Sequence, residues 1–231
     1  MQFRHPLARY SQARDILNRY TLLTLNSQAD AVFILDEVLT SRLAAGGLRS
    51  LVGLEPDMTT LGKYLGGSLA FGALGGRREI MAVFDPRSTN ALPHSGTFNN
   101  NTVTMRAGYA GLKQVYTPQV AKEHNGRGDA TMQKLRAVSE GTQLCFTGRG
   151  SLICSHFTAD GSSLQIRSIA DLKENETLKE LFWLHMMENG FWVARRGSLA
   201  LSIGVPQAEL DRFVSSTKQF LARYWDEVAL K

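Results

Sequence analysis

The stretch "TTLGKYLGGSLAFGALGGRREI", residues 59–80, decides how the rest of the chain is interpreted. It contains one lysine, Lys63, and six glycines: Gly62, Gly66, Gly67, Gly72, Gly75 and Gly76. A surface lysine needs no such flexible and apolar neighbourhood. Either the glycines bind a phosphate with help from the lysine, or the lysine is buried and reactive.

The phosphate-loop interpretation fails on spacing. A P-loop needs a glycine five residues before its Gly-Lys pair, and Ser or Thr directly after the lysine. Asp57 and Tyr64 occupy those two positions here. The motifs G-x-G-x-x-G, H-E-x-x-H and G-x-S-x-G are also absent from the sequence, so the usual signatures of dinucleotide binders, zinc proteases and hydrolases are missing.

The residues around this stretch predict an α/β fold. A helical pattern over residues 12–27 precedes the continuous apolar run Ala31–Leu35, which is typical of a strand buried on both faces of a parallel sheet. Residues 56–64 predict a second strand that ends near Lys63. Residues 68–74 predict a third strand, closed by a turn at the glycine pair that follows it.

In the second half of the chain short predicted strands are mixed with helices, and this pattern predicts an α+β domain. A Thr-Pro pair at residue 117 marks the start of a long helix, as N-cap and first helical position. We therefore expect a partial large domain over residues 1–117, a linking helix over 118–140 and a small domain over 141–231. The remaining expected elements are helices over 78–84, 101–116, 176–190 and 206–230, and strands over 142–148, 151–159, 191–195 and 199–204.

Composition excludes several classes of protein. The net charge is +5, but the basic residues are scattered, which disfavours nucleic acid and fits small anionic ligands better. No apolar run reaches the roughly 18 residues of a membrane span, and the first residues lack the apolar core of a secretory signal. Cys145 and Cys154 have no metal-site spacing and form no disulfide framework. We expect a cytoplasmic protein without metal.

The remaining chemistry joins Asp36 to Lys63. Both residues follow predicted strands of one sheet, and the carboxyl ends of such strands meet where open α/β sheets bind ligands. A lysine can form a Schiff base with an aldehyde cofactor, and a carboxylate can pair with its protonated ring nitrogen, as pyridoxal phosphate requires. The alternative is a plain Asp–Lys ion pair, or two unrelated surface residues.

Three blocks in order, "FILDEVLTSRLAAGGL", "PDMTTLGKYLGGSLAFGALGGRREIM" and "HSGTFNNNTVTMRAGYAGL", resemble the class III aminotransferases, which are fold type I pyridoxal-phosphate enzymes. The sub-groups that the blocks resemble most are glutamate-1-semialdehyde aminomutases and β-phenylalanine-type aminotransferases. The resemblance implies a mostly parallel large domain followed by a small α+β domain. It also implies a transaminase or aminomutase that acts on a small amino acid, amino-aldehyde or keto acid.

The resemblance implies a role for each site residue. Asp36 would pair with the pyridine nitrogen, Val38 would pack against the ring, and Lys63 would form the Schiff base and then move protons. Thr97 would bind the cofactor phosphate of a partner subunit, which makes the family member a homodimer. Apolar surroundings would keep Lys63 neutral and therefore nucleophilic.

Arg195 and Arg196 are candidates for binding a substrate carboxylate, because arginine makes a planar bidentate fork to that group. The alternative is an ion pair at a strand edge. Since neighbouring strand residues face opposite sides, at most one of the two arginines should reach a site. Glu37, Tyr64 and the aromatic residues of the second half are expected to serve packing: Phe182, Trp183, Phe191 and Trp192. His94 is expected to pack in a turn.

Two departures from the family pattern qualify these expectations. Ser68 stands where many relatives have a glycine. Asp36 also lies close to the start of the sequence, whereas the family places several strands, a phosphate cup and a ring-covering aromatic residue ahead of it. We therefore expect this chain to bind the cofactor weakly by itself. The alternative function is a non-catalytic remnant that keeps the small domain and pairs with a full-length relative.

Overall fold

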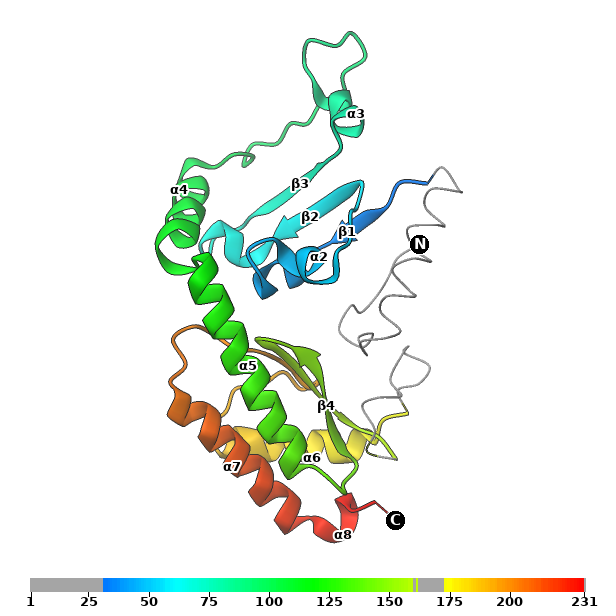
Figure 1. Cartoon of the computed structure of the whole chain (residues 1–231), viewed down its shortest axis with the longest axis vertical. Coiled ribbons are helices and arrows are strands. Elements are labelled where there is room, and N and C mark those ends of the chain that lie inside the picture. Colours follow the sequence, from blue (N-terminus) through cyan, green and yellow to red (C-terminus); the bar gives the residue numbers. More distant parts are fainter. Residues whose placement is uncertain (1–30, 160, 162–172, 231) are drawn as a thin grey trace. The chain divides into compact units, whose positions relative to one another are not determined.

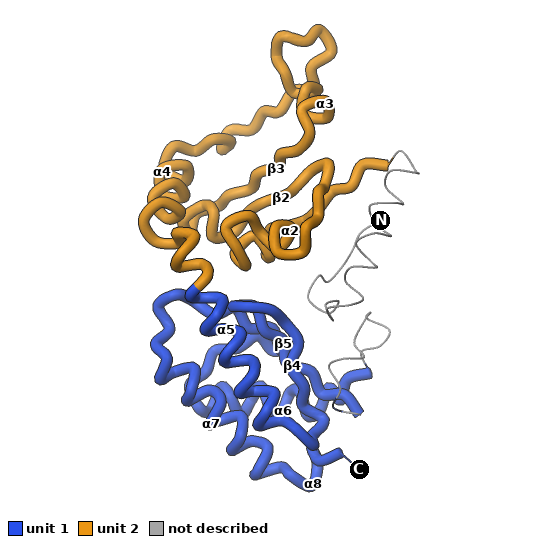
Figure 2. Tube along the Cα trace, in the orientation of Figure 1, with its two compact units in different colours: residues 1–14, 123–231 blue, residues 15–122 orange. Residues whose placement is uncertain are grey.

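The computed structural model describes residues 31–159, 161 and 173–230, so the helix expected over residues 12–27 lies outside it. The described residues form two compact units, which divide between Lys122 and Glu123 near the start of helix α5 (Pro118–Val138) (Figure 2). In chain order, the first unit is the part up to Lys122, orange and labelled unit 2 in Figure 2, and the second unit is the part from Glu123, blue and labelled unit 1. Each unit contains its own three-stranded sheet. The division into a partial large domain, a linking helix and a small domain stays a prediction.

The sheet of the first unit has the strand order β1-β2-β3 (Figure 1). Strand β1 (Ile34–Asp36) pairs in parallel with β2 (Met58–Gly62), as the sequence predicts, and β2 pairs antiparallel with β3 (Gly72–Gly76). Strand β3 includes the glycine pair that was expected to form a turn, so that expectation is wrong. The strand contains Gly76 because the backbone of the neighbouring segment comes very close there: a Cβ on Gly76 would lie 2.3 Å from the carbonyl oxygen of Asp57.

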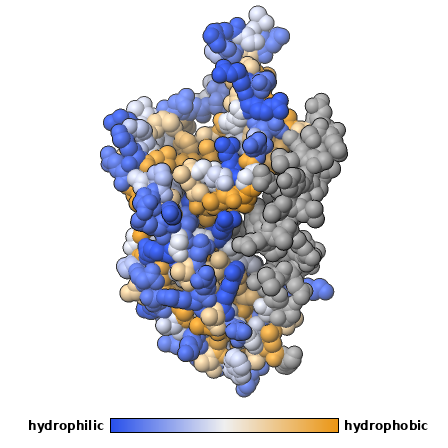
Figure 3. Space-filling model, viewed as in Figure 1, coloured by the Kyte–Doolittle hydropathy of each residue, from blue (hydrophilic) through white to orange (hydrophobic). Residues whose placement is uncertain are grey.

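Strand β1 is more exposed than its continuous apolar run predicts. The side chains of Val32 and Ile34 are 54% and 55% exposed, so the expectation of burial on both faces is wrong for this chain. Among the described residues β1 pairs only with β2, so its other edge has no strand partner there. Hydrophobic residues accordingly reach the visible surface among hydrophilic ones (Figure 3).

Short helices and turns complete the first unit. The helix expected over 101–116 is present as two consecutive segments, and Asn101 caps it, since its Oδ1 accepts from Val103 N at 3.0 Å and from Thr104 N at 3.1 Å. The helix expected over 78–84 is also present. The segments are η2 (Thr40–Leu43), α2 (Gly47–Val52), η3 (Lys63–Gly66), α3 (Arg78–Met81), η4 (Ala82–Phe84), α4 (Thr102–Ala110) and the π-helical turn η5 (Gly111–Val115).

The second unit is an antiparallel sheet with helices packed against one face. Its strands are β4 (Leu144–Arg149), β5 (Leu152–Phe157) and β6 (Ser198–Ala200), and its helices besides α5 are α6 (Glu176–Glu188), α7 (Gln207–Arg223) and α8 (Trp225–Val228). Phe157, Phe182 and Phe220 meet edge to face in the core, with ring centroids 5.1–6.1 Å apart. The α+β character expected for this half is therefore present.

The segment 191–195 is not the strand that its composition predicts. Helix α6 ends at Glu188. Gly190, two residues on, has a φ of 80° in the left-handed region, and Phe191 N then donates to the carbonyl of Met186 at 2.9 Å. The carbonyl of Val193 accepts from Trp183 Nε1 at 3.1 Å. These backbone groups are therefore bonded to the helix instead of a neighbouring strand. Of the strand expected over 199–204, β6 covers only the start.

No helix in the described part of the chain is both long enough and apolar enough to cross a membrane.

Candidate active site

Asp36 ends β1, and its carboxylate is held in one orientation. Asp36 Oδ1 accepts from Val38 N at 3.0 Å and from Thr60 Oγ1 at 2.9 Å. Both bonds use Oδ1, so among the described residues Oδ2 is left to accept a hydrogen bond from a ligand. A protonated ring nitrogen is a donor of the kind that fits this oxygen. Val38 lies beside the end of β2, because a Cβ on Gly62 would be 3.5 Å from Val38 Cγ1.

Lys63 directly follows β2 and starts the turn η3. Since β1 and β2 are parallel neighbours with Asp36 opposite Thr60, Asp36 and Lys63 stand at the carboxyl ends of adjacent strands. No ion pair joins the two residues within the part of the chain that the structure describes. Lys63 is exposed, so the apolar burial expected for it is not present among these residues.

The Lys63 backbone is in the left-handed region, with φ at 57°, a conformation that costs roughly 1–3 kcal/mol in a residue other than glycine. Such strain persists only where surrounding contacts hold it. The next residue, Tyr64, packs edge to face on Tyr116 with ring centroids 5.1 Å apart, and burial raises the pKa of its phenol. The packing role expected for Tyr64 is confirmed.

The glycines around Lys63 let η3 lie against α4. A Cβ on Gly108 would lie 2.2 Å from the carbonyl oxygen of Leu65, and a Cβ on Gly67 would lie 2.6 Å from the carbonyl carbon of Ala107. A Cβ on Gly66 would meet Phe71 Cβ at 2.4 Å. These three glycines therefore serve close packing of the turn that carries Lys63. Gly66 and Gly67 belong to the stretch 59–80, in which a Cβ on Gly72 or Gly75 would meet nothing within 4 Å.

Thr97 lies in the polar loop between η4 and α4, and its side chain is exposed. Three residues earlier, His94 packs its ring edge on Phe84 with centroids 5.6 Å apart, so its expected turn-packing role is confirmed. No hydrogen bond or ion pair joins Thr97 to Lys63 among the described residues. The phosphate role of Thr97 stays a prediction.

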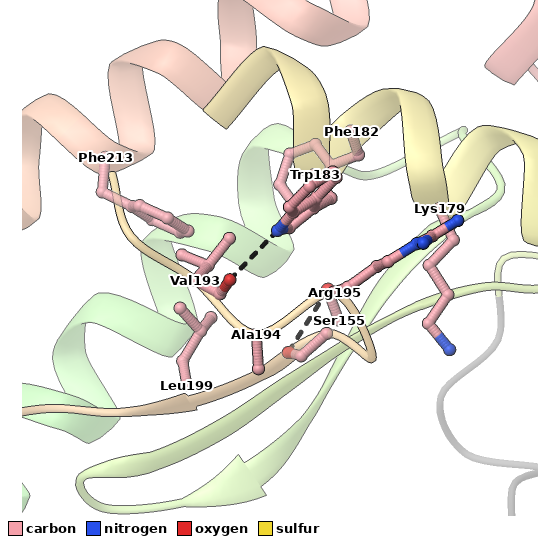
Figure 4. A pocket seen from close by; sticks show the side chains of 10 residues that line it. Ser155, Lys179, Phe182, Trp183, Val193, Ala194, Arg195, Leu199 and Phe213 are labelled. Atoms are coloured by element: carbon pink, nitrogen blue, oxygen red, sulfur yellow. Dashed lines mark hydrogen bonds between the residues drawn. The ribbon is translucent and has the colours of Figure 1, made fainter. Parts of the chain in front are cut away.

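The two arginines of the second unit differ in what they already bind. Arg195 forms an ion pair with Glu180, and its guanidinium lies 5.8 Å from the ring centroid of Trp183, along α6 (Figure 4). The cavity beside it has room for about 10 Å³, enough for one water at most. Arg196 Nε donates to Ser198 Oγ at 3.3 Å and has no carboxylate partner among the described residues.

Arg195 and Arg196 do not lie in a strand, so the expectation that they face opposite sides of one does not apply. They lie in a turn that is closed by a hydrogen bond of 2.8 Å from Gly197 N to the carbonyl of Ala194. Packing roles hold for Phe182, Trp183 and Phe191, the last of which meets Phe213 with ring centroids 5.1 Å apart. Trp192 is 90% exposed, so its expected packing role is wrong.

Glu37 is the residue whose importance the sequence did not indicate. Its side chain is 1% exposed and its carboxylate is hydrogen-bonded to the start of α2, although it was expected only to pack. A signal was present in the sequence: the Gly46–Gly47 pair, ten residues downstream, permits a backbone to approach a side chain closely.

Comparisons with known proteins show the family to which the chain belongs. The family profile of class-III aminotransferases matches residues 17–213. The chain is 47% identical over 195 residues to an uncharacterised aminotransferase of Schizosaccharomyces pombe, and 43% identical over 198 residues to the β-phenylalanine transaminase of Variovorax paradoxus. Each match covers 84% of this chain and 44% of the relative. A glutamate-1-semialdehyde 2,1-aminomutase of Methanocella arvoryzae is 33% identical over 201 residues, 84% of this chain and 46% of the relative.

Solved structures share the fold. The β-phenylalanine aminotransferase of Variovorax paradoxus superimposes with a TM-score of 0.87 at 40% identity, over 92% of this chain and 49% of its own. A transaminase solved with PLP bound gives a TM-score of 0.77 at 27% identity, over 90% of this chain and 48% of its own. The chain spans about half the length of the relatives it matches. The predicted fold class is confirmed, and the chain belongs to the class-III aminotransferase family.

Proposed function

We propose that this chain contributes the lysine-bearing half of a pyridoxal-phosphate site in a transaminase. The observation that carries the proposal is the position of Asp36 and Lys63 at the carboxyl ends of the parallel neighbours β1 and β2. In an open α/β sheet that edge is where ligands bind. Pyridoxal phosphate, when bound, supplies an electron sink for the substrate carbon.

Each residue of the chain has one task in this proposal. Lys63 holds the cofactor covalently through Nζ and later carries a proton at the same atom. Asp36 Oδ2 accepts from the protonated ring nitrogen while Oδ1 stays bonded to Val38 N and Thr60 Oγ1. Val38 packs against the ring. Thr97 binds the phosphate across a homodimer, which requires a second subunit.

Substrate recognition is assigned to Arg196. Arg195 already has Glu180 as a charged partner, whereas the guanidinium of Arg196 is hydrogen-bonded only to the hydroxyl of Ser198 among the described residues. An arginine without a carboxylate partner can take that of a small amino acid or keto acid bidentately. Transaminase is preferred to aminomutase because the identities to the two transaminases, 47% and 43%, exceed the 33% to the aminomutase.

The test is amino transfer from a β-amino acid to a keto acid in the presence of pyridoxal phosphate and of a polypeptide that supplies the first half of the Variovorax paradoxus relative. The expected result is product formation that requires Lys63 and is lost in Lys63→Ala. Arg196→Gln should raise KM for the carboxylate substrate at least tenfold, the effect of losing a charge-assisted pair, while Arg195→Gln should change KM little. Equal turnover in wild type and Lys63→Ala would contradict the proposal.

A second candidate function, a binding protein without turnover, is supported by one observation. Asp36 and Lys63 are both exposed within the described residues, and exposure leaves water around a lysine that should react as a neutral amine. In that case the chain would react with the cofactor at Lys63 yet transfer no amino group, even when a polypeptide with the first half of a relative is added.

A further inference from the structure

We infer that Glu37 is a positioning residue for Asp36 and Val38, because it fastens the turn after β1 to the start of α2. The inference rests on the proposed function, since it concerns how the two neighbours of Glu37 are presented to the cofactor. It assigns no contact between Glu37 itself and the cofactor.

The first argument is the buried carboxylate. Glu37 Oε2 accepts from Leu48 N at 2.9 Å and from Thr40 Oγ1 at 3.2 Å, and Oε1 accepts from Arg49 N at 2.8 Å. A carboxylate that is 1% exposed needs such donors, since an unpaired buried charge is strongly unfavourable. These three bonds therefore fix the position of the Glu37 side chain.

The second argument is the glycine that makes room for it. Gly47 has φ at 73°, and a Cβ at that position would lie 2.5 Å from Glu37 Oε2 and 2.6 Å from Oε1. No side chain can be placed there without displacing the carboxylate. Gly47 and Glu37 therefore form one fitted contact between two segments that are ten residues apart.

The third argument is the backbone of Glu37, which links this contact to the site. Glu37 N donates to the carbonyl of Thr60 at 3.0 Å, and Ser41 N donates to the carbonyl of Glu37 at 3.0 Å. Val38 N, one residue on, donates to Asp36 Oδ1. A shift of the Glu37 side chain must therefore move the peptide groups that orient the Asp36 carboxylate and the Val38 side chain.

The test compares the wild-type chain with Glu37→Gln, Gly47→Ala and the double variant. Leu48 N and Arg49 N donate to different oxygens of Glu37, and glutamine replaces one of these oxygens with an NH2 group that cannot accept from a backbone amide. Gly47→Ala pushes the carboxylate away. Two quantities are measured: amide hydrogen exchange over residues 36–49 without cofactor, and the dissociation constant and absorption spectrum with pyridoxal phosphate. Glu55→Gln, at an exposed glutamate, and Gly126→Ala, where a Cβ meets nothing within 4 Å, are the matched controls.

We expect about tenfold faster exchange at residues 38, 48 and 49 and about tenfold weaker cofactor binding with an altered spectrum in each single variant. The double variant should be no worse than the singles, because both remove the same contact. Unchanged exchange in Glu37→Gln, or faster exchange with an unchanged spectrum and dissociation constant, would overturn the inference. Failure of the wild-type chain to react with pyridoxal phosphate at Lys63 would instead overturn the proposed function, and the inference with it.

Discussion

Thr60 Oγ1 donates a hydrogen bond of 2.9 Å to Asp36 Oδ1, and the strand register places the two residues directly opposite each other on β1 and β2. The bond leaves the second carboxylate oxygen in a defined direction. It also connects the strand that carries Asp36 to the strand that ends at Lys63, so that the two proposed cofactor contacts are oriented together.

Removing this hydroxyl should weaken cofactor binding without unfolding the sheet. Thr60→Val keeps the β-branched shape that suits a strand, so we expect about fivefold weaker pyridoxal-phosphate binding, equivalent to about 1 kcal/mol, and little change in stability. Thr59→Val is the control, because residue 59 points to the opposite face of the strand. Equal effects of the two substitutions on the dissociation constant would contradict the role given to Thr60.

The packing of α4 on η3 gives a prediction about stability. Gly108→Ala places a Cβ 2.2 Å from the carbonyl oxygen of Leu65, a backbone atom that cannot move alone. We expect the free energy of unfolding to fall by about 2 kcal/mol or more, measured by urea denaturation. Gly126→Ala, in α5 with nothing near its Cβ, should instead leave stability unchanged or raise it by about 1 kcal/mol. Similar losses in both variants would show that helix propensity and not the close contact is responsible.

Ser68 is strained by its backbone. Its φ is 73°, in the left-handed region, and its side chain is exposed. Ser68→Gly should therefore raise the free energy of unfolding by up to about 1 kcal/mol, the steric cost less the entropy that glycine adds to the unfolded chain. Ser88→Gly, at an exposed turn residue without positive φ, should lower it slightly. A loss of stability in Ser68→Gly would show that the strain is not relieved.

A buried cluster in the second unit predicts how stability depends on pH. His156 Nδ1 lies 3.1 Å from Glu174 Oε1, and Lys179 Nζ lies 2.6 Å from Glu174 Oε2. Burial alone would lower the pKa of His156, but interactions with Cys154 and Glu174 outweigh it and raise the pKa to about 9. Of these two partners, Glu174 is in direct hydrogen-bonding contact with the imidazole.

Because the folded pKa of His156 lies above the value of 6.5 in an unfolded chain, its stabilisation is fully present below pH 6.5 and is lost as pH rises through about 9. The whole effect is on the order of 3 kcal/mol. Urea denaturation from about pH 6 to about pH 10 should show this decline in wild type and a flatter profile in His156→Gln. His94→Gln, at an exposed histidine, should keep the wild-type profile; a decline that persists in His156→Gln would refute the assignment.

The sequence predicted elements whose signals are local. Thr117 and Pro118 mark the start of α5, as predicted, and the helices expected over 101–116 and 176–190 are present, because caps and left-handed glycines act within a few residues. The order of Asp36 and Lys63 after two parallel strands was also predictable, since each follows a predicted strand.

Features that depend on distant contacts were not predictable. The segment at Phe191 has strand composition, but its backbone bonds to α6, and no local pattern reveals that partner. The role of Glu37 depends on an approach to Gly47 that only the fold creates. The exposure of Ile34 and Lys63 depends on which segments cover the sheet. The local sequence pattern predicted that these side chains would be buried, but they are exposed in the described chain.

The most direct test of the central claim, that Lys63 holds pyridoxal phosphate, is borohydride reduction followed by peptide mass spectrometry. The 231-residue chain is incubated with pyridoxal phosphate, alone and with a polypeptide that supplies the first half of the Variovorax paradoxus β-phenylalanine transaminase. The account predicts a reduced adduct on Lys63, stoichiometric with the added half, smaller without it, and absent in Lys63→Ala. An adduct spread over surface lysines, or none at Lys63 when the first half is present, would contradict it.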